Sequence, residues 1–166
     1  MTRRMLRRNG KALRVRRGTT TLEFAFILPV FLIFVFGLMT VGHYRMSADL
    51  LKGACRDAAR YGAMQDVTTA MARERFRQRV AAGMNVNLVT LSIKDLGAID
   101  ANGGAMPKST SDFNSLPDIE LANAPSRRLF AVRAEVNYNK IAVIPVNWIP
   151  WAKNMSVTAQ VFTRHE

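Results

Sequence analysis

Residues 24–42 read FAFILPVFLIFVFGLMTVG. This stretch runs for 19 residues without a charged side chain, and 13 of them are Leu, Ile, Val or Phe. As a helix it covers roughly 28 Å, which is close to the bilayer hydrocarbon thickness of about 30 Å. Its side chains favour insertion by roughly −4 to −8 kcal/mol, of which Pro29 and the glycines remove only part. We therefore predict a transmembrane helix over residues 19–43.

The residues before this stretch are strongly basic. Of the 24 Lys and Arg residues, 8 lie in the first 17 positions, where there is no acid, and they include Arg14, Arg16 and Arg17. Because basic flanks stay in the cytoplasm, residues 1–18 are expected to form a cytoplasmic leader. Residues 44–166 would then face the periplasm of a Gram-negative bacterium. Topology explains the basic tail, so we expect membrane lipid as a partner and no nucleic acid.

A cleaved secretory signal peptide is the first competing interpretation, because it also has a basic start and an apolar core. The apolar run here is longer than the usual core of about 7 to 15 residues. No small-x-small cleavage site follows it, since the next residues are His43, Tyr44 and Arg45. These details disfavour the signal peptide.

The chain offers few residues for chemistry. It has one cysteine, Cys55, and two histidines, which exclude an internal disulfide and a multi-histidine metal site. No nucleophile elbow, zinc-protease helix or phosphate-binding glycine loop occurs. We expect no enzyme activity, cofactor, metal or small-molecule substrate, and a buried, inert Cys55 thiol.

An acid stands at the edge of the predicted span. Glu23 is expensive there without a partner, which suggests a functional role. If the chain were cut after Gly18, the new ammonium at Thr19 and the Glu23 carboxylate would lie one helical turn apart. The two charges could pair within one chain or between neighbouring chains, and Glu23 would then set the register of assembly. Pro29 removes one helix N–H and is interpreted either as a tolerated kink or as a kink that sets how the first turns meet partner helices.

These features resemble a known family. The basic leader, Gly18, four further residues, Glu23, Phe24 and an apolar helix with Pro29 resemble the prepilin-peptidase motif of type IV pilin-like proteins. The continuation is similar to the TadE-like family, the minor pilins or pseudopilins of the tight-adherence (Flp, type IVc) pilus system. The post-span phrase of that family is matched here by Arg56, Ala58, Ala59, Arg60, Tyr61 and Ala63.

The resemblance implies a pilus-assembly role. It implies removal of residues 1–18 by a prepilin peptidase after Gly18, followed by assembly with other pilin or pseudopilin subunits and the Tad apparatus. The chain would be a single-pass inner-membrane protein, and helix packing would use residues 24–39. The alternative is an unprocessed single-span anchor whose periplasmic domain binds an envelope or secretion-system partner.

The residues after the span alternate between helical and strand patterns. The fold class expected is therefore α+β: a pilin-like long N-terminal transmembrane helix followed by a small periplasmic domain with about three antiparallel strands. The spacing of apolar residues extends the first helix beyond Arg45 and includes Met46 among its inward positions. The other elements expected are a helix over 70–82, strands over 85–94, 129–138 and 155–163, and an irregular connection over about 97–128.

Two features of this domain admit more than one interpretation. On the second helix, Met71, Phe76 and Val80 are expected to point inward and its arginines outward, either as a solvated face or as a binding site for phosphates or anionic lipid. Trp148 and Trp151 could lie at the membrane interface, touch a partner subunit or pack in the core.

Overall fold

The computed structural model describes residues 19–107, 109–143 and 155–166. It contains two compact units, Met1–Gly37 and Leu38–Glu166. Helix α1 (Thr19–Gly62) is continuous in secondary structure and contributes to both. Trp148 and Trp151 lie outside the described residues, so their placement stays a prediction.

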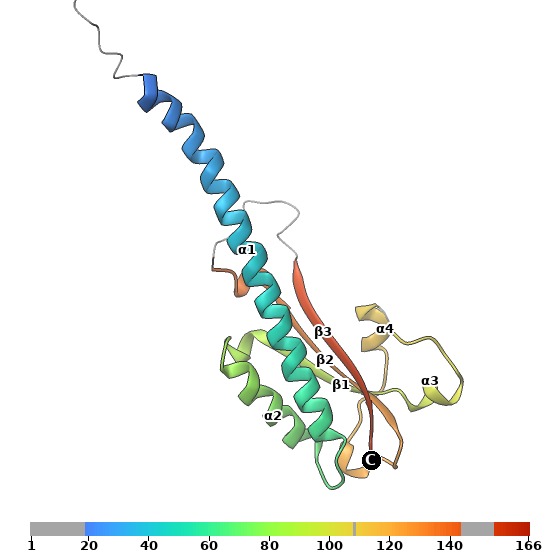
Figure 1. Cartoon of the computed structure of the whole chain (residues 1–166). Helices are drawn as coiled ribbons and strands as arrows, with labels where there is room; N and C mark the ends of the chain where they lie inside the picture. Colours follow the sequence, from blue (N-terminus) through green and yellow to red (C-terminus); the bar gives the residue numbers. More distant parts are fainter. Residues whose placement is uncertain (1–18, 108, 144–154) are drawn as a thin grey trace, which may run out of the picture. The chain divides into compact units, whose positions relative to one another are not determined.

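The second unit is an α+β domain, as expected. It combines the C-terminal part of α1 with one further long helix, three strands and several short helical segments (Figure 1). The elements after α1 are α2 (Thr69–Ala81), η1 (Val86–Leu88), β1 (Val89–Asp95), α3 (Gly97–Ala101), α4 (Thr110–Asn114), η2 (Leu121–Asn123), β2 (Leu129–Asn137), η3 (Tyr138–Lys140) and β3 (Ser156–Arg164).

The three strands form one antiparallel sheet in the order β1-β2-β3. The register pairs Ile93 of β1 with Val132 of β2, and Ala134 of β2 with Ala159 of β3. Because side chains alternate between the two faces of a strand, this register places apolar residues from all three strands together on one face. The prediction of three antiparallel strands is confirmed.

Helices α1 and α2 cover that apolar face (Figure 1). From α1 the fully buried residues include Leu51, Ala54 and Ala58, which recur at intervals of three and four. Small alanines let the helix approach the sheet closely. Met46, by contrast, is 69% exposed, so the expected inward row begins later than the spacing indicated. The sheet side of the core consists of Ile93, Phe130, Val132, Ala134, Val136, Tyr138, Val157 and Ala159.

Helix α2 begins at Thr69, one residue before the start expected from the sequence. The Thr68 side chain accepts a hydrogen bond from the Met71 backbone N–H at 3.2 Å and caps the helix. The buried row is Ala72, Phe76 and Val80, spaced by four residues. Met71 precedes that row by one position and is 45% exposed, so its expected inward placement is wrong. One residue turns a helix by about 100°, which carries the side chain away from the core.

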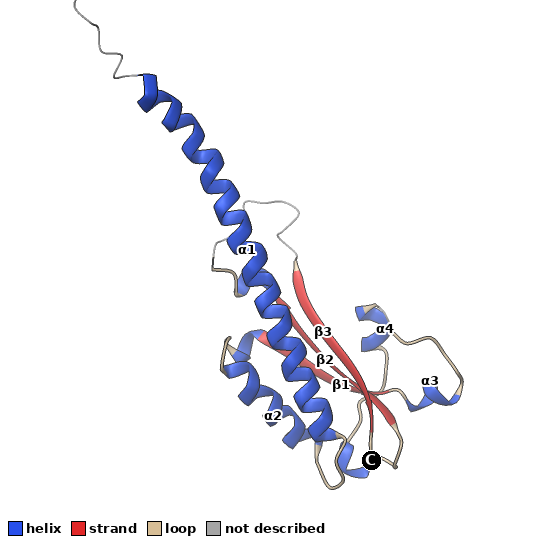
Figure 2. Cartoon of the chain, viewed as in Figure 1, coloured by secondary structure: helices blue, strands red, loops and turns tan. Residues whose placement is uncertain are grey.

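The opposite face of the sheet carries a smaller second layer. The segment expected as an irregular connection, residues 97–128, contains the short helices α3 and α4 (Figure 2). It also contains η2, whose Leu121 belongs to the core on the α1 side. Phe113 of α4 is fully buried and packs with Leu96, Leu129 and Ala131. A five-residue helix is not stable by itself, so packing of the Phe113 ring against the sheet stabilises α4.

Candidate membrane and assembly segment

The first unit presents an apolar helical surface. Within the described residues, α1 is the one helix long and apolar enough to cross a membrane, and none of its most apolar window is buried. Contiguous apolar exposure on this scale indicates a surface that is covered by lipid or by partner helices. Large exposed apolar side chains in this unit are Leu22, Phe24, Phe26, Ile27, Leu28, Val30, Phe31, Leu32, Ile33, Phe34 and Phe36.

The predicted assembly residues lie at the start of α1. Glu23 is the fifth residue of the helix, is exposed, and has no ion-pair partner among the described residues. Phe24 follows it and is 63% exposed. Pro29 lies inside α1, which continues as helix through it. Two of the three predicted groups, the carboxylate and the ring, are therefore available to a neighbouring chain.

The predicted processing site lies at the border of the described residues. Thr19 is the first residue that the structure describes, and it belongs to α1, so the residue that would follow the predicted cut is helical. Gly18 and the topology residues Arg14, Arg16 and Arg17 lie outside the described residues, so their roles stay predictions.

A contact missed by sequence reasoning joins α1 to the end of β2. Tyr138 is 1% exposed, and its hydroxyl donates a hydrogen bond to the Thr40 carbonyl at 2.9 Å. The same oxygen lies 3.3 Å from Nδ1 of His43, and the Tyr44 ring meets the Tyr138 ring edge-on with centroids 5.4 Å apart. Since the Tyr138 hydrogen points to Thr40, the geometry is satisfied when His43 Nδ1 donates. The strand predicted over 129–138 includes Tyr138, but the sequence gave no signal for the partners of its hydroxyl.

Cys55 lies in the core between α1 and the sheet. It is fully buried, and its thiol donates to the Ala159 carbonyl at 3.8 Å. Burial raises the pKa of the thiol to about 12. The prediction of a buried thiol is confirmed, and a thiol held protonated in this way is a poor nucleophile.

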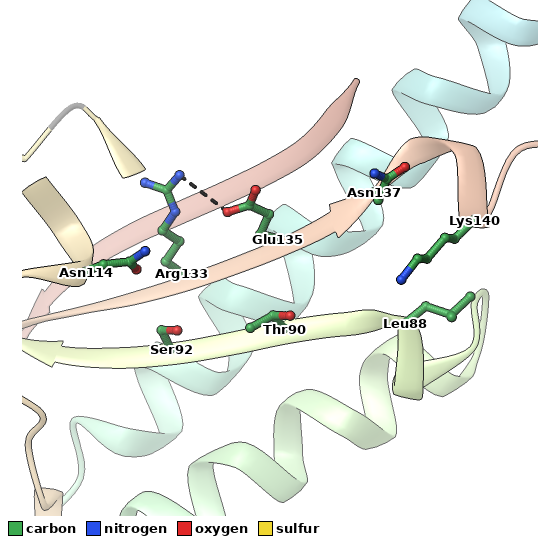
Figure 3. Close-up of a pocket in the computed structure, with 8 residues that line it drawn as sticks. All are labelled: Leu88, Thr90, Ser92, Asn114, Arg133, Glu135, Asn137 and Lys140. Carbon is green, nitrogen blue, oxygen red and sulfur yellow. Dashed lines mark ion pairs between the residues drawn. The ribbon is translucent and has the colours of Figure 1, made fainter. Parts of the chain in front are cut away.

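A polar hollow of about 280 Å³ lies on the sheet face away from α1 (Figure 3). Thr90 and Ser92 of β1 and Arg133 and Glu135 of β2 line its floor, and Asn114, Asn137, Lys140 and Leu88 complete the lining. Polar side chains are ordinary on the outer face of an antiparallel sheet. The hollow holds one ion pair, in which Arg133 Nη2 lies 3.8 Å from Glu135 Oε2.

Arg133 itself has a structural role. Its side chain is 8% exposed and its guanidinium lies 5.4 Å from the centre of the Phe113 ring. It also donates hydrogen bonds to Thr110 at the start of α4 and to Gln160 of β3. One buried cation thus connects the second layer to two strands, which sequence alternation alone did not reveal.

A second ion pair fixes the end of β1. The Arg128 guanidinium contacts both carboxylate oxygens of Asp95, at 2.9 Å from Nε to Oδ1 and 2.5 Å from Nη2 to Oδ2. The hydrogen bonds from Arg128 lower the pKa of Asp95 below its usual value. No group of three or more His, Cys, Asp and Glu able to hold a metal occurs in the described part of the chain.

Comparison with known proteins identifies the N-terminal part of the chain. The family model described as TadE-like protein matches residues 18–60. No curated protein and no solved structure matches the chain. The matched segment contains Glu23, Phe24, Pro29 and the apolar surface of the first unit, and extends through the α1 residues that pack on the sheet. The predicted resemblance is therefore confirmed: residues 18–60 of this chain are similar to the TadE-like family.

Proposed function

We propose that the chain is a minor pilin or pseudopilin that takes part in assembly of the Tad (Flp, type IVc) pilus. A prepilin peptidase removes the leader after Gly18, and the mature chain packs against other pilin or pseudopilin subunits in the inner membrane. The observation that carries the proposal is the coincidence of the TadE-like match with an exposed apolar helix that carries Glu23, Phe24 and Pro29. A single helix of this kind fits a single-pass membrane protein of a pilus-related family.

The helix supports insertion and assembly by the same surface. Burial of its aromatic and aliphatic side chains in lipid or against neighbouring helices replaces contact with water, which favours membrane residence. After cleavage, the ammonium of Thr19 and the carboxylate of Glu23 lie about one turn apart on α1. Opposite charges in a low-dielectric setting strongly prefer to be paired, so a neighbouring chain whose ammonium meets Glu23 is held in one axial register.

The second unit contributes recognition rather than catalysis in this proposal. It lies in the periplasm, because the basic leader keeps the preceding residues in the cytoplasm. The second unit binds the Tad assembly apparatus through the surfaces of α1, α2 and the sheet.

The mature N-terminus tests the proposal. The protein is extracted from membranes and its N-terminal peptide is determined by mass spectrometry, for the wild type and for Gly18→Ala. We expect a terminus at Thr19 in the wild type and an intact leader in the variant. Gly37→Ala is a matched control, because a Cβ at Gly37 meets nothing within 4 Å and this glycine lies inside α1, away from the predicted cut. A Met1 terminus in the wild type would contradict processing and favour the unprocessed anchor instead.

A further inference from the structure

The second unit has two ends, and one of them adjoins the predicted membrane span. Just after β2, the Tyr138 hydroxyl donates a hydrogen bond to the Thr40 carbonyl of α1 at 2.9 Å. Just after β3, the Glu166 backbone N–H donates to the Ala63 carbonyl at 2.8 Å. Because β2 and β3 are antiparallel, the end of β2 and the start of β3 lie together at the Thr40 end (Figure 1). We call this the span-proximal end, and its described residues are 38–46, 137–143 and 155–158.

The Tyr138 contact sets the depth of the span-proximal end. Thr40 lies three positions before the predicted end of the span at residue 43, which is about 4.5 Å along a helix. The Tyr138 hydroxyl also lies 3.3 Å from Nδ1 of His43, and its ring meets the Tyr44 ring. The headgroup layer occupies roughly 5 to 8 Å on each side of the hydrocarbon. The Tyr138 side chain therefore lies at the boundary between hydrocarbon and headgroups, where tyrosine is enriched in membrane proteins.

The span-proximal end carries no carboxylate among its described residues. No Asp or Glu occurs in the three segments that form it, and its two charged side chains are the exposed cations Arg45 and Lys140. Anionic headgroups attract cations and repel carboxylates, so this distribution is the one expected of a surface that faces phospholipid. The opposite end, by contrast, carries several acids: Asp66, Asp95, Asp118 and Glu166.

The apolar surface of the span continues onto this end. Val143 is 72% exposed, and the Ala142 backbone N–H beside it donates to the Tyr138 carbonyl at 2.8 Å. This hydrogen bond keeps Val143 next to the Tyr138 contact and therefore close to the end of the span. Burial of such a side chain at the edge of the hydrocarbon removes it from water, which is favourable. The occupant indicated is lipid, because the surface begins with exposed residues of the predicted span itself: Leu38, Met39 and Val41.

We propose that the span-proximal end of the second unit docks on the headgroup layer of the bilayer, with Val143 at the hydrocarbon boundary and Arg45 among the lipid phosphates. The membrane residence of α1 rests on the function proposed above. The hydrogen bond between Tyr138 and Thr40 then holds the domain against the membrane, so that no free length of helix separates the two. The sheet is thereby kept at the membrane surface with one end in contact with lipid.

The first test measures depth by fluorescence quenching. The full chain is reconstituted in vesicles of phosphatidylethanolamine and phosphatidylglycerol that contain a phospholipid with a nitroxide on its headgroup. A fluorophore is attached to Val143→Cys or Ser156→Cys at the span-proximal end, or to Ser126→Cys at the opposite end, and all three positions are exposed. The native Cys55 is fully buried and supplies only a background signal. We expect several-fold stronger quenching at positions 143 and 156 than at position 126.

The second test places a carboxylate at each end of the domain. Val143→Asp forces a negative charge into the headgroup layer, so unfolding of the second unit should relieve it. We expect its folded-to-unfolded ratio to fall roughly fivefold more in phosphatidylglycerol vesicles than in neutral phosphatidylcholine vesicles. Met64→Asp is the matched control, because Met64 is also a large exposed apolar side chain and lies just after α1 at the opposite end. Its effect should be equal in the two kinds of vesicle.

Equal quenching at the three positions would overturn the proposal, and so would an effect of Val143→Asp that does not depend on phosphatidylglycerol. Loss of quenching at position 143 when other pilus proteins are added would assign this end to a protein partner instead. Resistance of the chain to alkaline extraction from the vesicles tests membrane residence separately. A chain that is extracted contradicts the function proposed above, whereas an inserted chain with equal quenching contradicts only the docking of the span-proximal end.

Discussion

Replacing Tyr138 by Phe removes one hydroxyl from a buried ring that is 1% exposed. The lost interactions are the 2.9 Å hydrogen bond to the Thr40 carbonyl and the 3.3 Å contact with His43. The Thr40 carbonyl lies inside α1 and still accepts a backbone hydrogen bond of the helix. The half-buried His43 ring can form a hydrogen bond with water instead of Tyr138. The substitution therefore leaves no buried polar group without a partner. We expect it to lower the free energy of unfolding by the net value of one hydrogen bond, ~0.5–1.5 kcal/mol.

The assay measures unfolding of the second unit in urea. The full chain is kept in non-ionic detergent, and the folded fraction is monitored by pulse proteolysis. A loss of about 1 kcal/mol changes the folded-to-unfolded ratio roughly fivefold, which this assay resolves. Tyr44→Phe is the control, because the Tyr44 ring contacts Tyr138 but the described residues give its hydroxyl no hydrogen bond. Equal unfolding of the wild type and Tyr138→Phe, or equal losses in the two variants, would refute the assigned role of the hydroxyl.

Three further predictions concern the second unit. The pKa of Asp95 is lowered in the folded state, so its pair with Arg128 stabilises the fold fully above the unfolded-state pKa of about 3.9. This stabilisation is lost as the pH falls through the folded-state pKa. Asp95→Asn should therefore lower the urea midpoint at pH 7, and the difference from wild type should shrink below about pH 4. Gly62→Ala places a Cβ 2.8 Å from Cδ1 of the fully buried Leu121, so we expect a loss of roughly 1–3 kcal/mol in the same unfolding assay. Cys55, with a pKa of about 12 and no exposure, should react with maleimide at pH 8 at least about a hundredfold more slowly in the folded chain than in urea, and fast labelling of the folded chain would contradict its burial.

The sequence predicted the elements that depend on long apolar patterns. Continuous hydrophobicity identified α1, and alternation predicted a strand over 129–138, which the structure has as β2 over Leu129–Asn137. The inward face of a helix was less certain, since Met71 and Ala72 both fit an apolar stripe. The structure buries the smaller one because the buried row follows the four-residue spacing of Phe76 and Val80.

The segment between β1 and β2 could not be derived in this way. Helices α3 and α4 are each five residues long, too short for a periodic pattern. Phe113 is buried because the ring docks on the far side of the sheet, and Arg133 is buried beside it, which are tertiary effects.

The sheet also constrains how the domain folds. Its pairs join residues far apart in sequence, with Ile93 opposite Val132 and Ala134 opposite Ala159, and no tight hairpin connects the described strands. Closing such loops costs chain entropy before any pairing is gained, so the strands cannot nucleate the fold locally. The helices can form from neighbouring residues, and α1 is synthesised before any strand. We therefore expect α1 of the newly made chain to provide the surface on which α2 and then the sheet assemble. Because β2 is the central strand, β1 and β3 reach their register only once β2 is in place.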